Sequence, residues 1–471
     1  MRRTKIVCTI GPASSSRERI AGLIRAGMNV ARLNFSHGSH EDHGAVIGLV
    51  RSISAELGTR VAVLQDLQGP KIRIGTLATS PTRLAHGARV TITTESLQGT
   101  AERLTTTYAQ LPNDVRVGDR ILMSDGLVEL RVVGVEARQV DCEVVRGGLI
   151  GERSGLNLPG VQVSAPSLTE KDKDDLRFGI QREVDYVAIS FVRCADDVLA
   201  ARQFIRDAGS DIPVIAKLEK PEAIENLDAI LEVANGVMVA RGDLGVEVSV
   251  EKVPILQKQI IARANRRSLP VITATQMLES MVHAETPTRA EASDVANAIL
   301  DGTDAVMLSA ETAIGEHPIE VVETMSRIAE EAEAAPDAFR VVQLPDDPSG
   351  SYPHVVAEAA ATAARQLPAK AIVAITQSGY TPLIVSKYRS PAPIIGITWS
   401  ERVARRLPLL WNVQAQVVVD RSLGLDAVVD SVSDLVRQTG LASAGDTVIV
   451  TANASAAQVQ GATNLLEVRR L

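Results

Sequence analysis

Aromatic residues are scarce in this sequence: Phe, Trp and Tyr together make up 3% of its 471 residues. Without many rings, the interior must be built largely from Val, Ile, Leu and Ala. Hydrophobic residues nevertheless make up 45% and charged residues 23%, which are the proportions of an ordinary globular chain with ample material for a core. A chain of this length is expected to form about three domains.

Cysteine is also rare, with Cys8, Cys142 and Cys194 scattered along the chain. They have neither the spacing of a metal site nor that of a disulfide framework, which suits a reducing cytosol. No uninterrupted apolar run reaches membrane length, and the apolar stretch near the N-terminus is too short for a signal peptide. We therefore expect a cytoplasmic protein without a membrane segment.

An excess of basic residues is missing as well, because the formal net charge is −8. This balance argues against a general nucleic-acid binder. An anionic small substrate is still compatible with it if Lys and Arg gather locally. The sequence contains no Walker A motif, no G-x-G-x-x-G motif, no repeat array and no low-complexity tract.

Eight short apolar runs rich in β-branched residues recur along the first two thirds of the chain. They cover residues 5–10, 29–35, 61–67, 186–192, 213–219, 236–242, 270–276 and 305–311. Helical patterns lie between several of them, at 17–26, 196–207, 221–233, 251–267 and 288–300. Near-continuous apolar strands that alternate with helices indicate a parallel sheet covered on its outside. Eight such units predict a closed (β/α)8 barrel.

The spacing between the third and fourth runs is much longer than the others. Alternating segments such as "ARVTITTES" and a hairpin turn at Asp125-Gly126 indicate β structure there. We expect a small β-barrel domain over 70–160, inserted into a barrel formed by 1–69 and 161–333. A domain inserted at that face is expected to act as a lid.

A second interruption is the Pro-, Asp- and Gly-rich segment 334–353, which we interpret as a linker. Beyond it, apolar runs such as "KAIVAIT", "PIIGIT" and "DTVIVT" alternate with helical patterns. Residues 354–471 are therefore expected to form a separate open α/β domain.

Polar residues gather at the C-terminal ends of the predicted barrel strands, which is the end that carries the active site in this fold. Side chains two apart share a face of a strand. The sets found this way are Arg32, Asn34 and Ser36; Asp66 and Gln68; Lys217 and Glu219; Thr273 and Thr275; and Ser309 and Glu311. Five converging sets are unlike the scattered polar ends of an ordinary sheet.

The mouth of the barrel is expected to hold both signs of charge. Arg32, Arg73 and Lys217 suit phosphate oxygens, whereas Glu219 and Asp243 would repel them. A Mg²⁺ ion resolves this conflict because it binds one or two carboxylates together with substrate oxygens. The pattern predicts phosphoryl transfer or enolate chemistry at a metal.

The segment "VMVARGDLGVE" fits this interpretation better than a cell-adhesion tripeptide. Gly242 lets a turn bring backbone N–H groups close to a ligand. Together with the Thr275 hydroxyl, these groups are expected to hold a substrate carboxylate, while Asp243 reaches the metal.

Simpler structural roles exist for several of these residues. Lys217 could be only an ion-pair partner of Glu219, Asp243 a helix cap, and Arg73 a solvated loop residue. We interpret His37, His40 and His43 as residues of a surface loop and helix start rather than as a zinc site, with His37 close to the mouth.

Long segments of the chain resemble the signature segments of pyruvate kinase, in the order of that family. They are "ARLNFSHG", "DLQGPKIR", "GLNLPG", "KLEKPEAIEN", "VARGDLGVE", "ATQMLESM", "PTRAEASDVANAILDG" and "LSAETAIGEHP". The resemblance is dense over about residues 1–330 and looser in the C-terminal domain. It implies transfer of a phosphoryl group from phosphoenolpyruvate to ADP, giving pyruvate and ATP in glycolysis.

The resemblance also implies roles for residues. Arg32, Arg73 and Lys217 would bind the transferring group, Glu219 and Asp243 would hold Mg²⁺ or Mn²⁺, and Gly242, Asp243 and Thr275 would hold the carboxylate. Asn34, His37, Arg73 and, more weakly, Arg153 would contact the nucleotide. Water ordered by Thr275, Ser309 and Glu311 is our hypothesis for the proton donor.

Many members of this family need K⁺, held at positions like Asn34, Ser36, Asp66 and Leu67. This chain resembles the branch with Leu67, Gln68, Lys71 and Ile74, in which a tethered ammonium stands in for the ion. The resemblance therefore implies that K⁺ is not required.

In the C-terminal domain, the polar segment Thr376, Gln377, Ser378, Gly379 and Thr381 comes between a predicted strand and a helix. Hydroxyls and free N–H groups at a helix start make an anion site, although an ordinary polar turn would look the same. The resemblance implies a phosphorylated allosteric effector at this loop, and a homotetramer. Two rival functions stay open: a metal-dependent pyruvate-enolate aldolase and a non-catalytic metabolite-binding paralogue.

Overall fold

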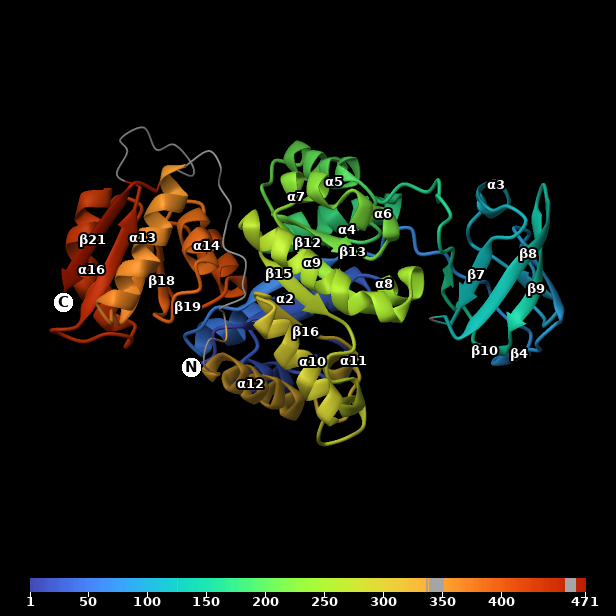
Figure 1. Ribbon diagram of the computed structural model, residues 1–471, viewed down its shortest axis with the longest axis horizontal. Coiled ribbons are helices and arrows are strands. Elements are labelled where there is room, and N and C mark those ends of the chain that lie inside the picture. The colour runs from blue at the N-terminus through green and yellow to red at the C-terminus, as the bar shows by residue number, and fades with distance from the viewer. Residues whose placement is uncertain (125, 336–337, 339–350, 454–462) are drawn as a thin grey trace.

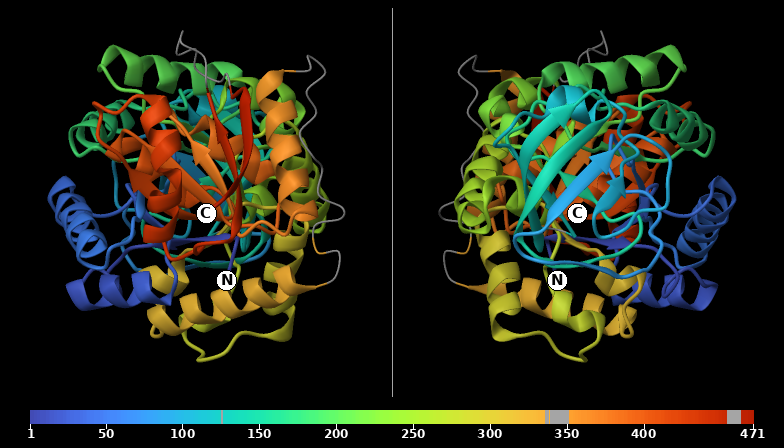
Figure 2. Two further views of the ribbon diagram at one scale, coloured as in Figure 1. Left: turned by 90° about the vertical axis from the view of Figure 1, so that its left-hand side faces the viewer. Right: turned by 90° about the vertical axis from the view of Figure 1, so that its right-hand side faces the viewer.

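The computed structural model describes residues 1–124, 126–335, 338, 351–453 and 463–471. It consists of three parts arranged in a row, with a barrel in the middle, a β unit at one end and an α/β unit at the other (Figure 1). Figure 2 shows the molecule from its two ends: the α/β unit lies in front of the barrel in the left view, and the β unit lies in front of it in the right view. Among the described residues, no helix combines the length and apolar character needed to cross a bilayer.

Eight parallel strands form the closed barrel, and every one of them lies within a predicted apolar run. They are β1 (Lys5–Thr9), β2 (Val30–Asn34), β3 (Ala62–Asp66), β12 (Tyr186–Ile189), β13 (Val214–Leu218), β14 (Gly236–Ala240), β15 (Val271–Ala274) and β16 (Ala305–Leu308). The ring closes in the order β1-β16-β15-β14-β13-β12-β3-β2. The register pairs Asn34 with Asp66, so that the C-terminal ends of β2 and β3 are level. The predicted (β/α)8 barrel is confirmed.

Alternation along each strand divides the barrel core into two layers. Leu64 of β3 points into the barrel and packs with Met238 of β14, whereas Val63 packs outward under the helices. Both faces of the strands are thus buried, which explains the near-continuous apolar runs in the sequence.

Helices surround the barrel and connect its strands. They are α1 (Arg17–Ala26), α2 (His40–Glu56), α4 (Glu170–Gln181), α5 (Ala195–Asp207), α6 (Pro221–Glu225), α7 (Leu227–Val233), α8 (Arg241–Val248), α9 (Val253–Arg266), α10 (Arg289–Leu300), α11 (Ala310–Ala313) and α12 (Pro318–Ala334), with 3-10 turns η1 (Val250–Lys252) and η2 (Glu279–Val282). A capping box is present at the start of α10. The Thr288 hydroxyl accepts from the Glu291 N–H at 3.2 Å, and the Glu291 carboxylate accepts from the Thr288 N–H at 2.8 Å.

The segment between β3 and β12 contains β structure with a hydrophobic core of its own. Its elements are β4 (Thr82–Leu84), β5 (Arg89–Thr93), β6 (Arg103–Thr105), α3 (Leu111–Asp114), β7 (Arg120–Met123), β8 (Val128–Glu136), β9 (Gln139–Arg146), β10 (Gly148–Ile150) and β11 (Leu156–Asn157). They form a six-stranded sheet and a two-stranded sheet. The expected hairpin joins β7 to β8, which are antiparallel, although Asp125 of its turn lies outside the described residues.

The C-terminal part is an open sheet in the order β19-β18-β17-β20-β21. Its elements are α13 (Tyr352–Gln366), β17 (Ala371–Ile375), α14 (Tyr380–Lys387), β18 (Ile394–Thr398), α15 (Glu401–Arg406), η3 (Leu407–Leu409), β19 (Val413–Val418), α16 (Leu425–Gln438), β20 (Thr447–Ala452) and β21 (Leu465–Arg470). Most of the predicted linker, 334–353, lies outside the described residues.

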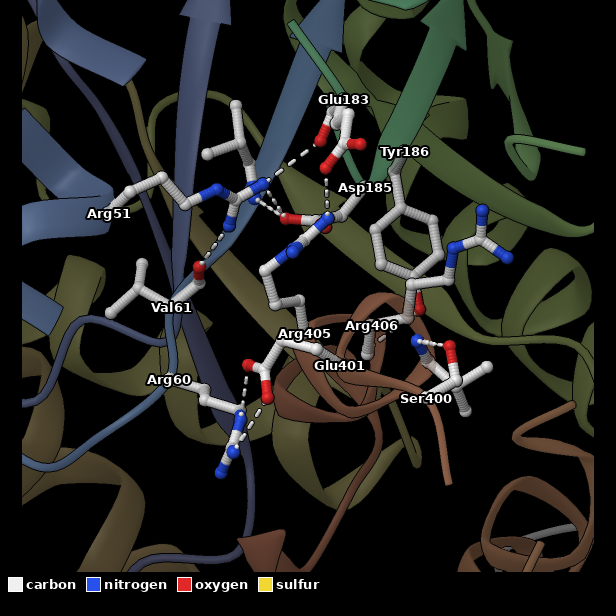
Figure 3. Close-up of polar contacts among 12 residues, drawn as sticks. Arg51, Arg60, Val61, Glu183, Asp185, Tyr186, Ser400, Glu401, Arg405 and Arg406 are labelled. Atoms are coloured by element: carbon white, nitrogen blue, oxygen red, sulfur yellow. Dashed lines mark hydrogen bonds and ion pairs between the residues drawn. The ribbon is translucent and has the colours of Figure 1, made fainter. Parts of the chain in front are cut away.

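Ion pairs join the C-terminal part to the end of the barrel where the strands begin. Asp185, directly before β12, is buried and lies 2.7 Å from Arg51 of α2 and 3.2 Å from Arg405 of α15 (Figure 3). Arg60 pairs with Glu401 at 2.8 Å in the same view. The C-terminal ends of the strands, on the other side, are left for the cleft described next.

Candidate active site

A cleft of about 360 Å³ lies at the C-terminal ends of the barrel strands. Predicted site residues from many separate strands and loops line it: Arg32, Asn34, Ser36, His37, Lys71, Lys217, Glu219, Asp243, Thr275 and Ser309. The convergence expected from strand alternation therefore occurs, and both signs of charge face the same space.

Lys217 is the centre of the charge network in this cleft. Its Nζ lies 2.8 Å from Glu219 Oε1 and 3.2 Å from Asp66 Oδ1, and it donates to Ser190 Oγ at 2.7 Å. Burial lowers the pKa of Lys217, but the carboxylates of Asp66 and Glu219 raise it further, so that the net pKa is above its usual value. Lys217 is therefore a fixed cation at neutral pH.

Arg32 is held against the floor of the cleft. Its Nε donates to Asp66 Oδ2 at 2.7 Å, and its Nη1 donates to Thr9 Oγ1 at 2.9 Å. Burial raises the pKa of Asp66, but Lys217 and Arg32 outweigh it and the net pKa is below the usual range. Asp66 thus stays ionised and orients two cations toward the cleft.

The two predicted metal ligands face one space. Glu219 Oε2 accepts from the Phe191 N–H at 3.0 Å, while its buried Oε1 lies 2.8 Å from the Lys217 ammonium. Burial raises the pKa of Glu219, and repulsion from Asp243 raises it further. The positive charge of Lys217 lowers it, but the net pKa is above its usual value. Two carboxylates with hard oxygen ligands that line one cleft fit Mg²⁺. Among the described residues, His, Cys, Asp and Glu form no metal-binding group of three or more.

The predicted glycine-flanked turn is instead the first turn of a helix, since α8 begins at Arg241 directly after β14. A Cβ at Gly242 would lie 2.9 Å from Thr275 Cγ2, so only glycine allows the start of α8 to approach the end of β15 this closely. The first N–H groups of any helix have no partner inside it. They are suited to an anion at the position expected for a substrate carboxylate.

Three residues from the predicted polar sets lie behind the cleft instead of on its wall: Asp66, whose partners are given above, Thr273 and Glu311. Thr273 is buried and its hydroxyl donates to Thr303 Oγ1 at 2.9 Å. Glu311 is also buried, where Oε2 accepts from the Ser309 N–H at 2.6 Å and Oε1 from the Leu278 N–H at 3.2 Å. The chain leaves β16 at Leu308 and enters α11, so the period of two no longer applies to Glu311.

Arg73 and Arg153 lie where the inserted unit joins the barrel and do not line the cleft. Arg73 Nη1 donates to the Arg153 carbonyl at 3.1 Å, and Arg73 pairs with Gly155 in an antiparallel bridge. Burial lowers the pKa of His37, and the positive charges of Arg73, Lys71 and Arg32 add to this. The cations are therefore close enough to affect His37 at the mouth.

The residues expected around a monovalent cation are present but largely engaged. Asn34 Oδ1 accepts from the Ser36 N–H at 3.1 Å, and the Leu67 carbonyl accepts from Ser190 Oγ at 2.8 Å. Asp66 is shared by Arg32 and Lys217. The other two histidines of this region lie in the first turns of α2 and are also engaged. His40 pairs with Asp175 at 2.7 Å, and His43 stacks on Phe35.

The predicted effector loop precedes α14, far from the cleft. Thr376 Oγ1 accepts from the Gly379 N–H at 2.9 Å, and the Thr381 and Thr463 hydroxyls are 2.8 Å apart. Gly379 has φ +89°, and Gln377 and Ser378 lie between it and Thr376. The loop is a compact polar turn at a helix start.

Two residues that the sequence did not single out hold residues of the cleft in place. Ser190 links Lys217 to the Leu67 carbonyl. Its position as the one small polar residue in the apolar run "YVAISFV" was a usable signal. Arg241 contacts the backbone of Thr275, and nothing in the sequence pattern indicates that contact.

The fold and the cleft define a (β/α)8-barrel phosphotransferase. The family description "Pyruvate kinase, barrel domain" matches residues 1–322, and "Pyruvate kinase, alpha/beta domain" matches 354–469. The chain therefore belongs to the pyruvate kinase family, whose members transfer the phosphoryl group of phosphoenolpyruvate to ADP in glycolysis.

Individual relatives agree with this assignment. Pyruvate kinase of Staphylococcus aureus strain MRSA252 is 46% identical over 99% of this chain and 80% of its own length, and that of strain USA300 is 47% identical over the same shares. A pyruvate kinase crystal structure from Cryptosporidium parvum has a TM-score of 0.91 at 37% identity, covering 100% of this chain and 96% of that one.

Proposed function

We propose that this cleft transfers the phosphoryl group with Lys217, Arg32 and Arg73 as the cations that meet it. The observation that supports this most directly is the buried Lys217 ammonium, which lies between Glu219 and Asp66 at the wall of a cleft also lined by Arg32 and Asp243. The group in flight carries dispersed negative charge, and fixed cations stabilise it at no cost of reorganisation.

The metal in this proposal is Mg²⁺, with Mn²⁺ as an alternative, held by Glu219 and Asp243. When bound, the ion neutralises carboxylate and phosphate charge in the same site. Glu219 is buried, the neighbouring Asp243 raises its pKa further, and both carboxylates line the cleft, which supports this assignment.

The remaining steps are assigned to residues around the same cleft. The N–H groups of Gly242 and Asp243, together with the Thr275 hydroxyl, hold the substrate carboxylate. Lys217 stabilises the enolate that remains after transfer. A water held by Thr275 and Ser309 then gives its proton to the enolate carbon, and Glu311 orients Ser309 through its backbone N–H.

The nucleotide is assigned to Asn34, His37, Arg73 and Arg153, with the inserted unit of residues 70–160 closing over it as a lid. The backbone of Arg73 belongs to that unit, while its charge acts on His37 of the barrel. Movement of the unit would therefore carry a cation into or out of the site.

The ion requirements give a direct test in a coupled assay that measures pyruvate formed from phosphoenolpyruvate. We expect activity to need both ADP and Mg²⁺, and to change by less than about twofold on adding K⁺, because the Lys71 ammonium supplies the charge of the free ion. Choline replaces K⁺ as the ionic-strength control. Strong stimulation by K⁺ would reject the role of Lys71, whereas pyruvate formation without ADP would show that the site transfers the phosphoryl group to water.

Residues 354–471 are proposed to regulate the enzyme, as part of a cytoplasmic homotetramer, through an effector loop formed by Thr376, Gln377, Ser378, Gly379 and Thr381. We expect a phosphorylated metabolite to shift the saturation curve for phosphoenolpyruvate, and Thr381→Val to abolish that shift without changing basal turnover. A curve that no metabolite of a phosphorylated panel moves would count against regulation at this loop.

A further inference from the structure

The side chain of Arg241 extends from the start of α8 to the chain that follows β15. Its Nε and Nη2 donate to the Thr275 carbonyl at 3.2 and 2.8 Å, and Nη2 also reaches the Gln276 carbonyl at 3.3 Å. Its Nη1 forms an ion pair with Asp294 of α10 at 2.7 Å and donates to Gln257 of α9 at 3.3 Å. The Arg241 side chain is only 10% exposed. Its guanidinium thus connects α8, α9 and α10 to one short stretch of backbone.

That stretch has an unusual conformation. Thr275 has φ +76° and Gln276 has φ +55°, so two successive residues with a Cβ lie in the left-handed region. This region is disfavoured for such residues, above all for β-branched threonine. Such conformations persist only where the surroundings determine them, and they cluster at functional sites.

The left-handed backbone decides where the Thr275 side chain lies. Thr275 lines the cleft although it is beyond the end of β15, and its methyl group fills the space left by the missing Cβ of Gly242. Arg241 is the neighbour of Gly242 and fixes the same residue from behind. Only arginine has a planar fork of five donors that can satisfy two carbonyls, a carboxylate and an amide together.

We propose that Arg241 is a positioning residue for the proton-transfer half of the reaction. It never contacts the substrate, but holds Thr275 in its left-handed conformation and so aims the Thr275 hydroxyl at the substrate and its ordered water. The inference depends on the function proposed above for Thr275.

The test isolates proton transfer by following exchange of the methyl protons of pyruvate in D₂O by NMR, with Mg²⁺ and ATP present. In this exchange a methyl C–H bond of pyruvate breaks, the proton passes to solvent, and a deuteron from D₂O bonds to the same carbon. We expect Arg241→Lys to lower exchange by about tenfold or more, because small misplacements of catalytic groups cost up to about a hundredfold. The Arg241→Lys/Thr275→Val double variant should lose no more than the worse single variant, because residues that act as one unit are not additive.

Arg51→Lys is the matched control. Arg51 also holds two carbonyls and an aspartate, namely Val61 O at 3.1 Å, Glu183 O at 3.1 Å and Asp185 at 2.7 Å, but at the opposite end of the barrel (Figure 3). Exchange in this variant should stay within about twofold of the unmodified enzyme, as expected for substitutions away from the site. If Arg241 had only a structural role, Arg241→Lys and Arg51→Lys would change the exchange rate by the same factor.

The outcomes separate this proposal from the proposed function. The positioning role of Arg241 would be overturned if Arg241→Lys exchanges within a few-fold of the unmodified enzyme. It would also be overturned if the losses of the two single variants multiply in the double variant. In both cases the role proposed for Thr275 would stand. Unchanged exchange in Thr275→Val would overturn both. If Arg241→Lys does not fold, Asp294→Asn replaces it as the test. This substitution removes the ion-pair partner of the same guanidinium, and the Asp294 side chain is 39% exposed. A normal exchange rate in that variant would then reject the proposal.

Discussion

Replacing Lys217 with alanine is expected to lower turnover by about a hundredfold or more, the scale for losing one pre-organised electrostatic contact. Lys217 is the cation that both the transferring phosphoryl group and the enolate would meet. Its partners Asp66 and Glu219 raise its pKa and keep it protonated, so its charge is present before the substrate arrives. Water that fills the space left by alanine would have to reorganise around the developing charge.

Steady-state kinetics measure this effect, and thermal unfolding shows whether the variant folds. Lys258→Ala is the matched control, since Lys258 also pairs with an aspartate, Asp301, but its side chain is 52% exposed and does not line the cleft. Its turnover should stay within about twofold, as expected for a substitution away from the site. A Lys217→Ala enzyme within a few-fold of the unmodified one would remove Lys217 from the mechanism.

Replacing Asp304 with asparagine is expected to lower the free energy of unfolding by about 3–5 kcal/mol, the scale for removing one partner of a buried ion pair. Asp304 is buried between the barrel and the C-terminal part, 2.5 Å from Lys387 and 3.0 Å from Arg389. Burial lowers the pKa of Lys387 to about 8, and Asp304 is the main group that opposes this. Without the carboxylate, two buried cations would face each other with no anion between them.

Urea unfolding, followed through its first transition, measures this loss. Asp211→Asn is the control in the same interface, because Asp211 pairs with Arg402 at 3.0 Å and Arg406 at 2.8 Å but is 58% exposed. Removing an exposed pair should cost about 1 kcal/mol or less. Equal losses of unfolding free energy in the two variants would show that burial does not increase the contribution of Asp304 to stability.

Local sequence patterns were sufficient for most of the barrel. Strands buried on both faces must be apolar along their whole length, so each strand lies within an apolar run that could be recognised without knowing its neighbours. The cleft residues Lys217 and Glu219 followed from a period of two near a strand end.

The same rules failed where the chain leaves a strand. Glu311 follows the last residue of β16 by three positions and is in a helix, so alternation placed it on the cleft wall when it lies behind. The residues after Ala240 were expected to form a turn and instead begin α8. Both errors have one cause, because the point at which a strand ends depends on the neighbours to which it hydrogen-bonds.

The order of elements, the chemistry available at each strand end and the family of the chain were determined by the sequence itself, since each depends on residues close together in the chain. Tertiary structure alone decided which of those side chains meet. Contacts such as Arg241 with Thr275 and Asp304 with Lys387 join residues far apart in sequence, and the low-dielectric interior that makes them strong exists only after the chain has folded.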